Sequence, residues 1–493
     1  GALGRARHGG GMYHSMIKSF FQFSAGSWIS AAISFFTTPI TTYLILPSEF
    51  GKASLYTLVL NLAMIGVLAG ADQSFTRMFY ETDQEKRPSL LWNAIIPPLF
   101  LCGGVTVFLV CCRFEVSRLL FGGIDQSLVV ILLSFNLFIS IFERFSVLVL
   151  RMKKRGLAFS ALRIVWSLAN SGGIVFFALT VEKSFLAVIF GVFVSNLCVF
   201  ALAFLLELKF WVKRCPLSIP KIKEILGYGL PFIPASILYW LLSSMDKLAL
   251  RSYTSFEEIG LYTAGQKIVI ALSLMQVGFG MFWAPVAYEQ YENKDSKIFF
   301  SRVAKTIAGG MFLVSFLSIA CKDIIVLIFD NAYLPSAKIM PFMVFSPLAL
   351  TVSQVTAMGI NLKKRTYWHL FVTLISASVN FVGNLLLVPL YGAKGAAVST
   401  GIAYIVFFYV GTFISRKVYP VSYSLVRFSI GTVTLFVVAT VNTFSGSLTF
   451  ELLSVTIGGV AVFLLYKSEM LKGIRVLRDV ILETISKKRE EKE

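Results

Sequence analysis

Long apolar stretches follow one another along this chain, and short polar segments separate them. A helix that spans a bilayer needs roughly 20 mostly apolar residues, so the pattern predicts an all-α polytopic membrane protein with about 14 transmembrane helices. We expect these helices over residues 20–46, 53–72, 91–112, 127–150, 158–180, 184–206, 229–250, 259–284, 303–321, 339–361, 367–390, 394–415, 424–444 and 449–466.

Four landmarks in the sequence recur about 209 residues apart, which indicates an internal duplication. Each predicted copy holds six helices, and an even number gives both copies the same orientation in the membrane, a parallel repeat. The last two helices have no counterpart and are an addition. The landmark pairs are Gly51 and Gly260, Tyr80-Glu81 and Tyr288-Glu289, Lys153-Lys154-Arg155 and Lys363-Lys364-Arg365, and Asn170 and Asn380.

The duplication also predicts how the chain is divided. Residues 1–15 are interpreted as a leader, and residues 16–206 form an N-terminal six-helix lobe. A basic, proline-containing linker over residues 207–228 lies where the two copies should join. We expect a second six-helix lobe over residues 229–415, the added helix pair within 416–466, and a charged cytoplasmic tail over 467–493.

Composition supports the membrane assignment, and the placement of charge adds an orientation. The chain is 56% hydrophobic and only 14% charged, with a net charge of +19. Of the Lys and Arg residues, 31 fall on one set of alternating loops and tails, and 8 on the other. By the positive-inside rule, this asymmetry predicts that both termini are cytoplasmic. We expect a multi-pass protein of the cell (inner) membrane. The charge is therefore interpreted as a topology signal and not as a nucleic-acid surface.

The sequence offers no pattern typical of an enzyme. The six cysteines lack disulfide or metal-site spacing, and the predicted outer loops are short. We find no nucleophile with its base and no glycine-rich phosphate loop. A membrane-embedded polysaccharide polymerase or ligase is therefore disfavoured, and we expect no cofactor. Coupling to H+ or Na+ is left open.

Five motifs over residues 228–397 are distinctive. They are Tyr228-Gly229-Leu230-Pro231-Phe232-Ile233-Pro234, Ser244-Met245-Asp246-Lys247, Ile259-Gly260-Leu261-Tyr262, Trp283-Ala284-Pro285 and Val388-Pro389-Leu390-Tyr391-Gly392-Ala393-Lys394-Gly395-Ala396-Ala397. Together these motifs resemble the polysaccharide-transporter branch of the multidrug/oligosaccharidyl-lipid/polysaccharide (MOP) exporter superfamily, the Wzx-like flippases. This resemblance implies two MATE-like lobes and transfer of a polyprenyl-diphosphate-linked oligosaccharide, such as an O-antigen unit, from the cytoplasmic to the outer leaflet. It also implies membrane lipids and the polysaccharide polymerase and chain-length machinery as partners.

Charged residues inside predicted helices are the first candidates for a transport site, because charge in a bilayer core usually faces a cavity or a partner. Lys267 is the deepest of them, and we expect it to contact a diphosphate or an acidic sugar. The alternative is an ion pair within the bundle, for instance with Asp246. Asp246 is in turn a candidate for ion coupling or a structural partner.

The other candidates for substrate binding carry weaker arguments. Asp72 and Arg77, at the predicted cytoplasmic end of helix 53–72, are either headgroup contacts or interfacial charges. Arg144 and Arg163 either bind substrate or extend to the interface, and a Glu143–Arg163 pair is an alternative. Gln22 belongs to an unusually polar first helix. This helix either lines a cavity or packs closely against neighbouring helices through its small hydroxyl side chains. The Lys-Lys-Arg clusters are membrane anchors first, and a role in attracting an anionic lipid-linked substrate is left open.

Transport is the function that these features favour most. A flippase working by alternating access would pass the headgroup through a central cationic cavity. A flippase for a lipid II-type peptidoglycan precursor is a close alternative. A cation-coupled multidrug exporter of the same superfamily is a second alternative, although such a protein favours an acidic or apolar interior.

Overall fold

The computed structural model describes residues 25–213, 216–291 and 293–468, and this part of the chain is helical throughout, without strands. Eleven of its helical runs are long and apolar enough to cross a membrane. Every stretch predicted from hydropathy coincides with helix in the described residues. The all-α membrane fold is thereby confirmed, whereas the number of 14 spans stays a prediction.

The described chain divides into two compact units. The first contains the residues up to Thr263 together with Ile328–Tyr333, and the second contains Ala264–Leu327 and the residues from Leu334 onward. The division therefore falls inside a helix and not in the linker over residues 207–228. The domain boundaries drawn from the duplication stay a prediction.

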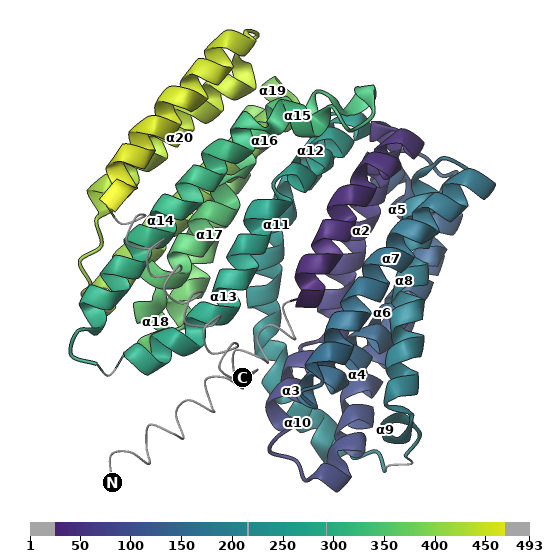
Figure 1. Cartoon of the computed structure of the whole chain (residues 1–493). Helices are drawn as coiled ribbons and strands as arrows, with labels where there is room; N and C mark the ends of the chain where they lie inside the picture. The colour runs from purple at the N-terminus through teal and green to yellow at the C-terminus, as the bar shows by residue number, and fades with distance from the viewer. Residues whose placement is uncertain (1–24, 214–215, 292, 469–493) are drawn as a thin grey trace, which may run out of the picture. The chain divides into compact units, whose positions relative to one another are not determined.

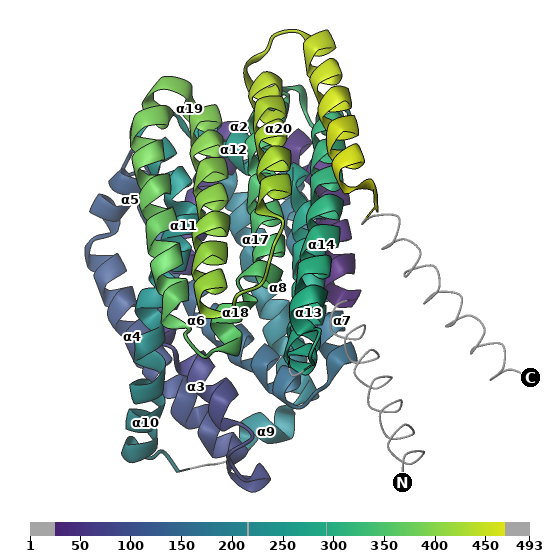
Figure 2. The same cartoon turned by 90° about the vertical axis from the view of Figure 1, so that its left-hand side faces the viewer.

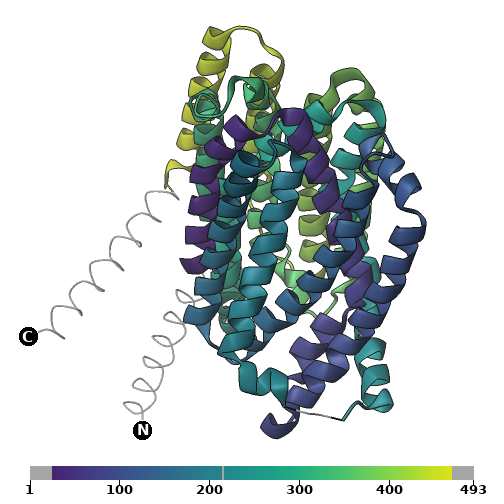
Figure 3. The ribbon, with the colours of Figure 1, turned by 90° about the vertical axis from the view of Figure 1, so that its right-hand side faces the viewer.

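The first unit is a helical bundle with an aromatic and aliphatic core. Its most extensive helix contacts lie between α7 and α8 and between α6 and its neighbours α4 and α8, and Figure 3 shows the helices of this region, blue to teal, running side by side. Phe75, Phe79 and Phe145 are fully buried there. Besides a helix over residues 25–44, its elements are α2 (Pro47–Leu68), α3 (Ala71–Met78), η1 (Gln84–Lys86), α4 (Arg87–Cys111), α5 (Arg113–Phe121), α6 (Ser127–Met152), α7 (Gly156–Thr180), α8 (Phe185–Leu206), α9 (Leu208–Val212), α10 (Ile219–Gly229), η2 (Leu230–Phe232), α11 (Ile233–Tyr253), most of α12 (Phe256–Ile268) and η3 (Asn331–Tyr333).

The second unit is also a bundle, in which α17 packs against α13, α14 and α19, and α20 packs against α14 and α16. Figure 2 shows α19 folded back on itself beside α20. The fold-back is at Gly392, where φ is 55° and ψ is −133°, a conformation that suits glycine. The elements are α13 (Ile270–Gln290), α14 (Ser296–Ala320), α15 (Lys322–Val326), α16 (Ser336–Met343), α17 (Phe345–Thr356), α18 (Met358–Leu362), α19 (Tyr367–Val418), α20 (Leu425–Phe444) and a final helix over Leu448–Ser468.

The two copies of the repeat have the same backbone turn at their Lys-Lys-Arg clusters. Lys154 and Lys364 both have positive φ, 58° and 54°. In each turn the arginine N–H donates to a carbonyl five residues earlier, Arg155 to Leu150 at 3.1 Å and Arg365 to Ile360 at 3.0 Å. Left-handed residues that close a helix in this way are a helix-ending motif. The duplication seen in sequence is therefore also present in local structure.

Several predicted spans end early or are divided, which the hydropathy pattern did not predict. The span over 53–72 ends early, because Ala69 and Gly70 are both left-handed and stop α2 at Leu68. The span over 259–284 is not one helix, since Val269 separates α12 from α13. The span over 339–361 is divided in the same way into α16, α17 and α18. Apolar residues continue through the break at Val269, so hydropathy alone predicted a single helix there, whereas polar residues follow the break at Gly70.

Candidate functional site

Lys267 lies in the last turn of α12, just before the break at Val269. Its side chain is partly buried, and among the described residues of its own unit no hydrogen bond or ion pair is formed with it. The last carbonyls of a helix carry partial negative charge, which favours a cation in this turn. Interrupted helices in transporters often place such termini at binding sites. Lys267 is therefore a cation without a carboxylate partner in its unit, next to a helix break.

Asp246 is held by a tyrosine. The Tyr262 hydroxyl of α12 donates to Asp246 Oδ2 of α11 at 2.5 Å, and Asp246 is only 2% exposed. Tyr262 is thus one partner of Asp246 within the first unit. The hydrogen bond fixes the carboxylate in place and leaves its coupling role a prediction.

A polar seam joins α2, α11 and α12 beside this pair. Ser54 Oγ and Thr263 Oγ1 are hydrogen-bonded at 2.7 Å, and both side chains are buried. Their numbers differ by 209, so they are equivalent positions of the repeat. The Lys247 ammonium donates to Ser54 Oγ at 3.3 Å. Sequence reasoning did not select Ser54, Tyr262 or Thr263, although the spacing of the repeat could have indicated the first and the last.

Glycines allow the close approach of α2 and α12 at this seam. A Cβ at Gly51 would overlap the carbonyl oxygen of Phe256, and a Cβ at Gly260 would overlap that of Pro47. The two contacts are reciprocal, since Pro47 and Phe256 are themselves equivalent in the repeat. The glycine landmarks of the duplication are thus explained by backbone-to-backbone packing.

Asp72 and Arg144 are brought together, and Arg77 lies apart from them. Arg144 Nη2 of α6 lies 2.7 Å from Asp72 Oδ2 of α3, with side chains 44% and 8% exposed. Arg77 pairs with Glu81 at 3.1 Å on the surface. Sequence analysis offered two roles for Arg144, substrate binding and extension to the membrane interface. The structure adds a third role, an ion pair with Asp72 that joins α3 to α6. Gln22 lies outside the described residues.

Arg163 faces a small cavity together with Glu143. The cavity has a volume of about 190 Å³ and lies among α6, α7 and α8. The expected Glu143–Arg163 ion pair is absent from the described contacts; the Arg163 guanidinium instead lies 5.4 Å from the centre of the Phe159 ring. The cavity wall also holds Trp166, whose Nε1 donates to Asn196 Oδ1 at 2.9 Å. Arginine packs readily against aromatic rings, and the Glu143 carboxylate in the same cavity wall adds a second favourable neighbour without a direct ion pair.

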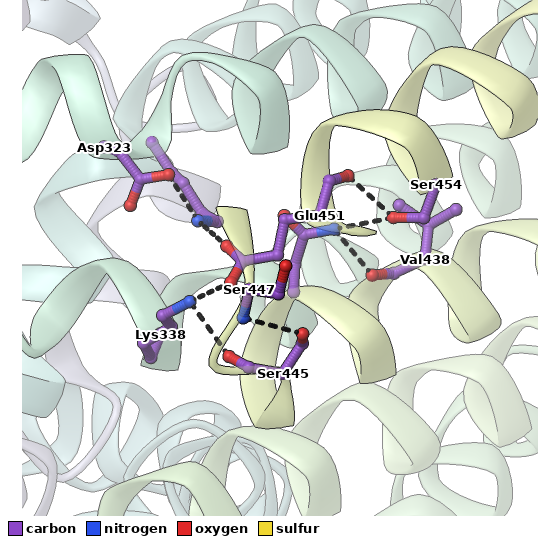
Figure 4. A network of polar contacts seen from close by, with 9 residues as sticks. Asp323, Lys338, Val438, Ser445, Ser447, Glu451 and Ser454 are labelled. Atoms are coloured by element: carbon purple, nitrogen blue, oxygen red, sulfur yellow. Dashed lines mark hydrogen bonds and ion pairs between the residues drawn. The ribbon is translucent and has the colours of Figure 1, made fainter. Parts of the chain in front are cut away.

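Within the second unit, a buried carboxylate on the final helix forms ion pairs with two lysines of the preceding helices (Figure 4). Glu451 of the final helix is 2% exposed, and its Oε2 lies 2.8 Å from the Nζ of Lys322, which is 1% exposed. Lys338 of α16 forms an ion pair with the other carboxylate oxygen and donates to the Ser445 carbonyl at 3.2 Å. Lys322 also pairs with Asp323 at 2.6 Å. Neither lysine was a candidate from the sequence, because both lie outside the helices predicted over 303–321 and 339–361.

The fold is that of known membrane transporters. The solved structure of the lipid II flippase MurJ, in an inward closed conformation, is similar with a TM-score of 0.68 at 15% identity, over 93% of this chain and 99% of that chain. An outward-facing multidrug resistance MATE family transporter of the MOP superfamily has a TM-score of 0.56 at 15% identity, over 81% and 95%. For a MATE transporter of Vibrio cholerae the TM-score is 0.54 at 15% identity, over 82% and 97%. These likenesses show the fold.

Sequence comparison adds the family. An uncharacterized membrane protein of Methanocaldococcus jannaschii is 24% identical over 203 residues, which are 40% of this chain and 40% of that protein. A family model described as "Polysaccharide biosynthesis protein" matches residues 16–290, more than half of the chain. With its multi-pass helical fold, this chain belongs to the polysaccharide biosynthesis protein family.

Proposed function

We propose that this chain is a flippase that moves a polyprenyl-diphosphate-linked oligosaccharide, an O-antigen or similar surface polysaccharide unit, from the cytoplasmic to the outer leaflet. The observation that carries the proposal is Lys267, a cation at a helix break with no carboxylate partner among the described residues of its unit. A diphosphate is an anion, and a charge-assisted hydrogen bond from an ammonium suits it. The family, named for polysaccharide biosynthesis, supports an oligosaccharide as the headgroup.

In this proposal the protein works by alternating access and performs no covalent chemistry. The oligosaccharide headgroup passes Lys267 while the polyprenyl tail stays in lipid. Polysaccharide polymerase and chain-length proteins would receive the product in the outer leaflet.

A peptidoglycan-precursor flippase is the second candidate, because the fold is similar to that of a protein named lipid II flippase over nearly the whole chain. Both candidate substrates contain a lipid diphosphate, so a contact with Lys267 does not distinguish them. The identity of the lipid that accumulates without the protein distinguishes them.

Loss of the gene in its native host is expected to make the lipid-linked substrate accumulate on the cytoplasmic side of the membrane. Extraction of lipid-linked glycans, with protease- and periodate-accessibility on each side, measures both its identity and its location. A surface polysaccharide unit supports the proposal, and a peptidoglycan precursor supports the second candidate. A normal amount of every lipid-linked glycan would refute both.

We further propose Asp246 as the residue that couples transport to H+ or Na+. Asp246→Asn keeps an oxygen that accepts the Tyr262 hydroxyl but removes the charge, so transport is expected to lose its dependence on the driving gradient. Transport rates at several pH values and sodium concentrations measure this. Asp83→Asn, at an exposed position, is the matched control. A gradient dependence that persists in Asp246→Asn excludes this role.

A further inference from the structure

A cleft with basic and apolar walls lies in the first unit, where α8 ends and α9 begins. Its volume is about 520 Å³. Lys153, Arg155 and Lys209 supply positive charge, and Leu205 and Leu208 supply apolar surface that is 65% and 43% exposed. We call it the α8 cleft. It combines phosphate-binding side chains with apolar side chains at the end of a membrane-spanning helix.

The basic side chains of the α8 cleft are held in place by one buried acid. Glu207 is 5% exposed and forms ion pairs with Lys153 and with Arg155, the latter at 3.0 Å. The Lys153 ammonium also lies 4.5 Å from the centre of the Phe210 ring. Three basic groups face one carboxylate, so the cleft keeps a positive excess, and the pairs order side chains that would otherwise be mobile.

The second unit has a cleft at the equivalent place, where α19 ends. Its volume is about 430 Å³, and Phe413, Arg416, Lys417 and Ser422 contribute to its wall. The Lys417 ammonium lies 4.5 Å from the centre of the Phe413 ring. We call this the α19 cleft. With the offset of 210 that relates the two Lys-Lys-Arg clusters, Lys417 takes the position that Glu207 has in the first copy.

The similarity of the two clefts extends to the Lys-Lys-Arg turns. The Lys363 ammonium lies 5.5 Å from the centre of the Tyr291 ring and 6.0 Å from that of Tyr419, and the Lys153 ammonium lies 4.5 Å from that of Phe210. Lys363 corresponds to Lys153 in the repeat, although Lys153 is part of the α8 cleft wall and Lys363 lies outside the α19 cleft wall. A basic, partly apolar recess therefore recurs at the basic end of the last helix of each copy, although the two sequences there differ.

From this recurrence we infer that the two clefts bind the headgroups of anionic phospholipids of the adjacent leaflet. A phospholipid carries its phosphate directly beside apolar chains, and the clefts place cationic and exposed apolar side chains in that same order. Basic side chains close to a membrane surface attract anionic lipid, and their aliphatic stems cover apolar surface. The site is separate from Lys267, and the inference does not rest on the proposed substrate.

An acidic side chain distinguishes the two clefts. No acidic side chain contributes to the wall of the α19 cleft among the described residues, whereas Glu207 offsets one of the three basic charges in the α8 cleft. Both walls therefore keep the same excess of two positive charges. Glu207→Gln should strengthen the α8 cleft, because it removes a negative charge and keeps a polar group of the same size.

Binding of phosphatidylglycerol to the purified full chain, measured by native mass spectrometry in detergent, tests the inference. Arg416→Gln with Lys417→Gln is expected to lower the affinity about tenfold, whereas Glu207→Gln is expected to raise it. The control is Lys294→Gln with Arg302→Gln, which removes two exposed charges of the same unit outside the cleft. Because a gain of binding cannot come from misfolding, Glu207→Gln keeps the test valid if the double variant fails to fold.

Three results would overturn the inference. Equal losses in the cleft variant and in its control would show a general charge effect. Equal binding of phosphatidylcholine, or competition by inorganic phosphate at the same concentration, would show that an anionic lipid is not the ligand. Displacement of phosphatidylglycerol by the lipid-linked oligosaccharide would assign the clefts to the transport path. The lipid-binding experiment does not depend on translocation by the wild-type protein. A negative result for the clefts can therefore be distinguished from a failure of the proposed function.

Discussion

Replacing Lys267 with alanine is expected to lower translocation of a lipid-linked oligosaccharide about 10- to 100-fold, because a charged hydrogen bond contributes about 1.5–3 kcal/mol. The protein should remain folded, since the described part of its unit holds no carboxylate that Lys267 neutralises. The translocation rate is measured in reconstituted vesicles, and the melting temperature reports whether the variant remains folded. Lys267→Arg, which keeps the charge, should retain most of the activity.

The matched control is Lys294→Ala, which removes an exposed lysine of the loop between α13 and α14. Its rate should equal that of the wild type. If Lys267→Ala also translocates at the wild-type rate, the ammonium does not contact the substrate. If it loses activity together with a large fall in melting temperature, Lys267 is structural.

Replacing Glu451 with alanine is expected to have the largest effect on stability, about 3 kcal/mol of unfolding free energy. The change would leave the ammonium of Lys322, which is 1% exposed, with only Asp323 as a charged partner, and Lys338 with none among the described residues. It would also release the final helix from α15 and α16. Thermal unfolding of the purified protein measures the loss as a lower melting temperature.

Two further variants make this prediction specific. Lys338→Ala should destabilise less than Glu451→Ala, because the Lys338 side chain is 29% exposed and the Glu451–Lys322 pair remains. Asp83→Ala breaks an exposed pair with Lys86 and should leave the melting temperature unchanged. A melting temperature of Glu451→Ala equal to that of Asp83→Ala would contradict a clamp at this position.

Hydropathy and the duplication predicted the fold well, for a physical reason. A helix in lipid satisfies its own backbone hydrogen bonds, so a long apolar stretch has few alternatives to a helix. The repeat then predicted matching turns, which appear at Lys154 and Lys364. The helix break at Val269 was not predictable in this way, because apolar residues continue through it. The break at Gly70 depends on the left-handed backbone of Ala69 and Gly70, which hydropathy does not report.

The candidate site was only partly predictable, because depth along a helix does not reveal a partner on another helix. Asp72 and Arg144 were selected separately, yet they form one pair between α3 and α6. Asp246 was a suggested partner of Lys267, whereas Tyr262 on the next helix donates to it. Glu451 was not selected at all, since its burial depends on lysines more than 100 residues away in sequence.

The most direct test of the proposed function is translocation by the purified full chain in vesicles that contain a polyprenyl-diphosphate-linked oligosaccharide. Accessibility of the headgroup to an added glycosidase measures movement between leaflets. The proposal predicts that the wild type exposes the headgroup, that Lys267→Ala does so at least about tenfold more slowly, and that Lys294→Ala equals the wild type. No movement by the wild type, or equal rates for wild type and Lys267→Ala, would contradict it.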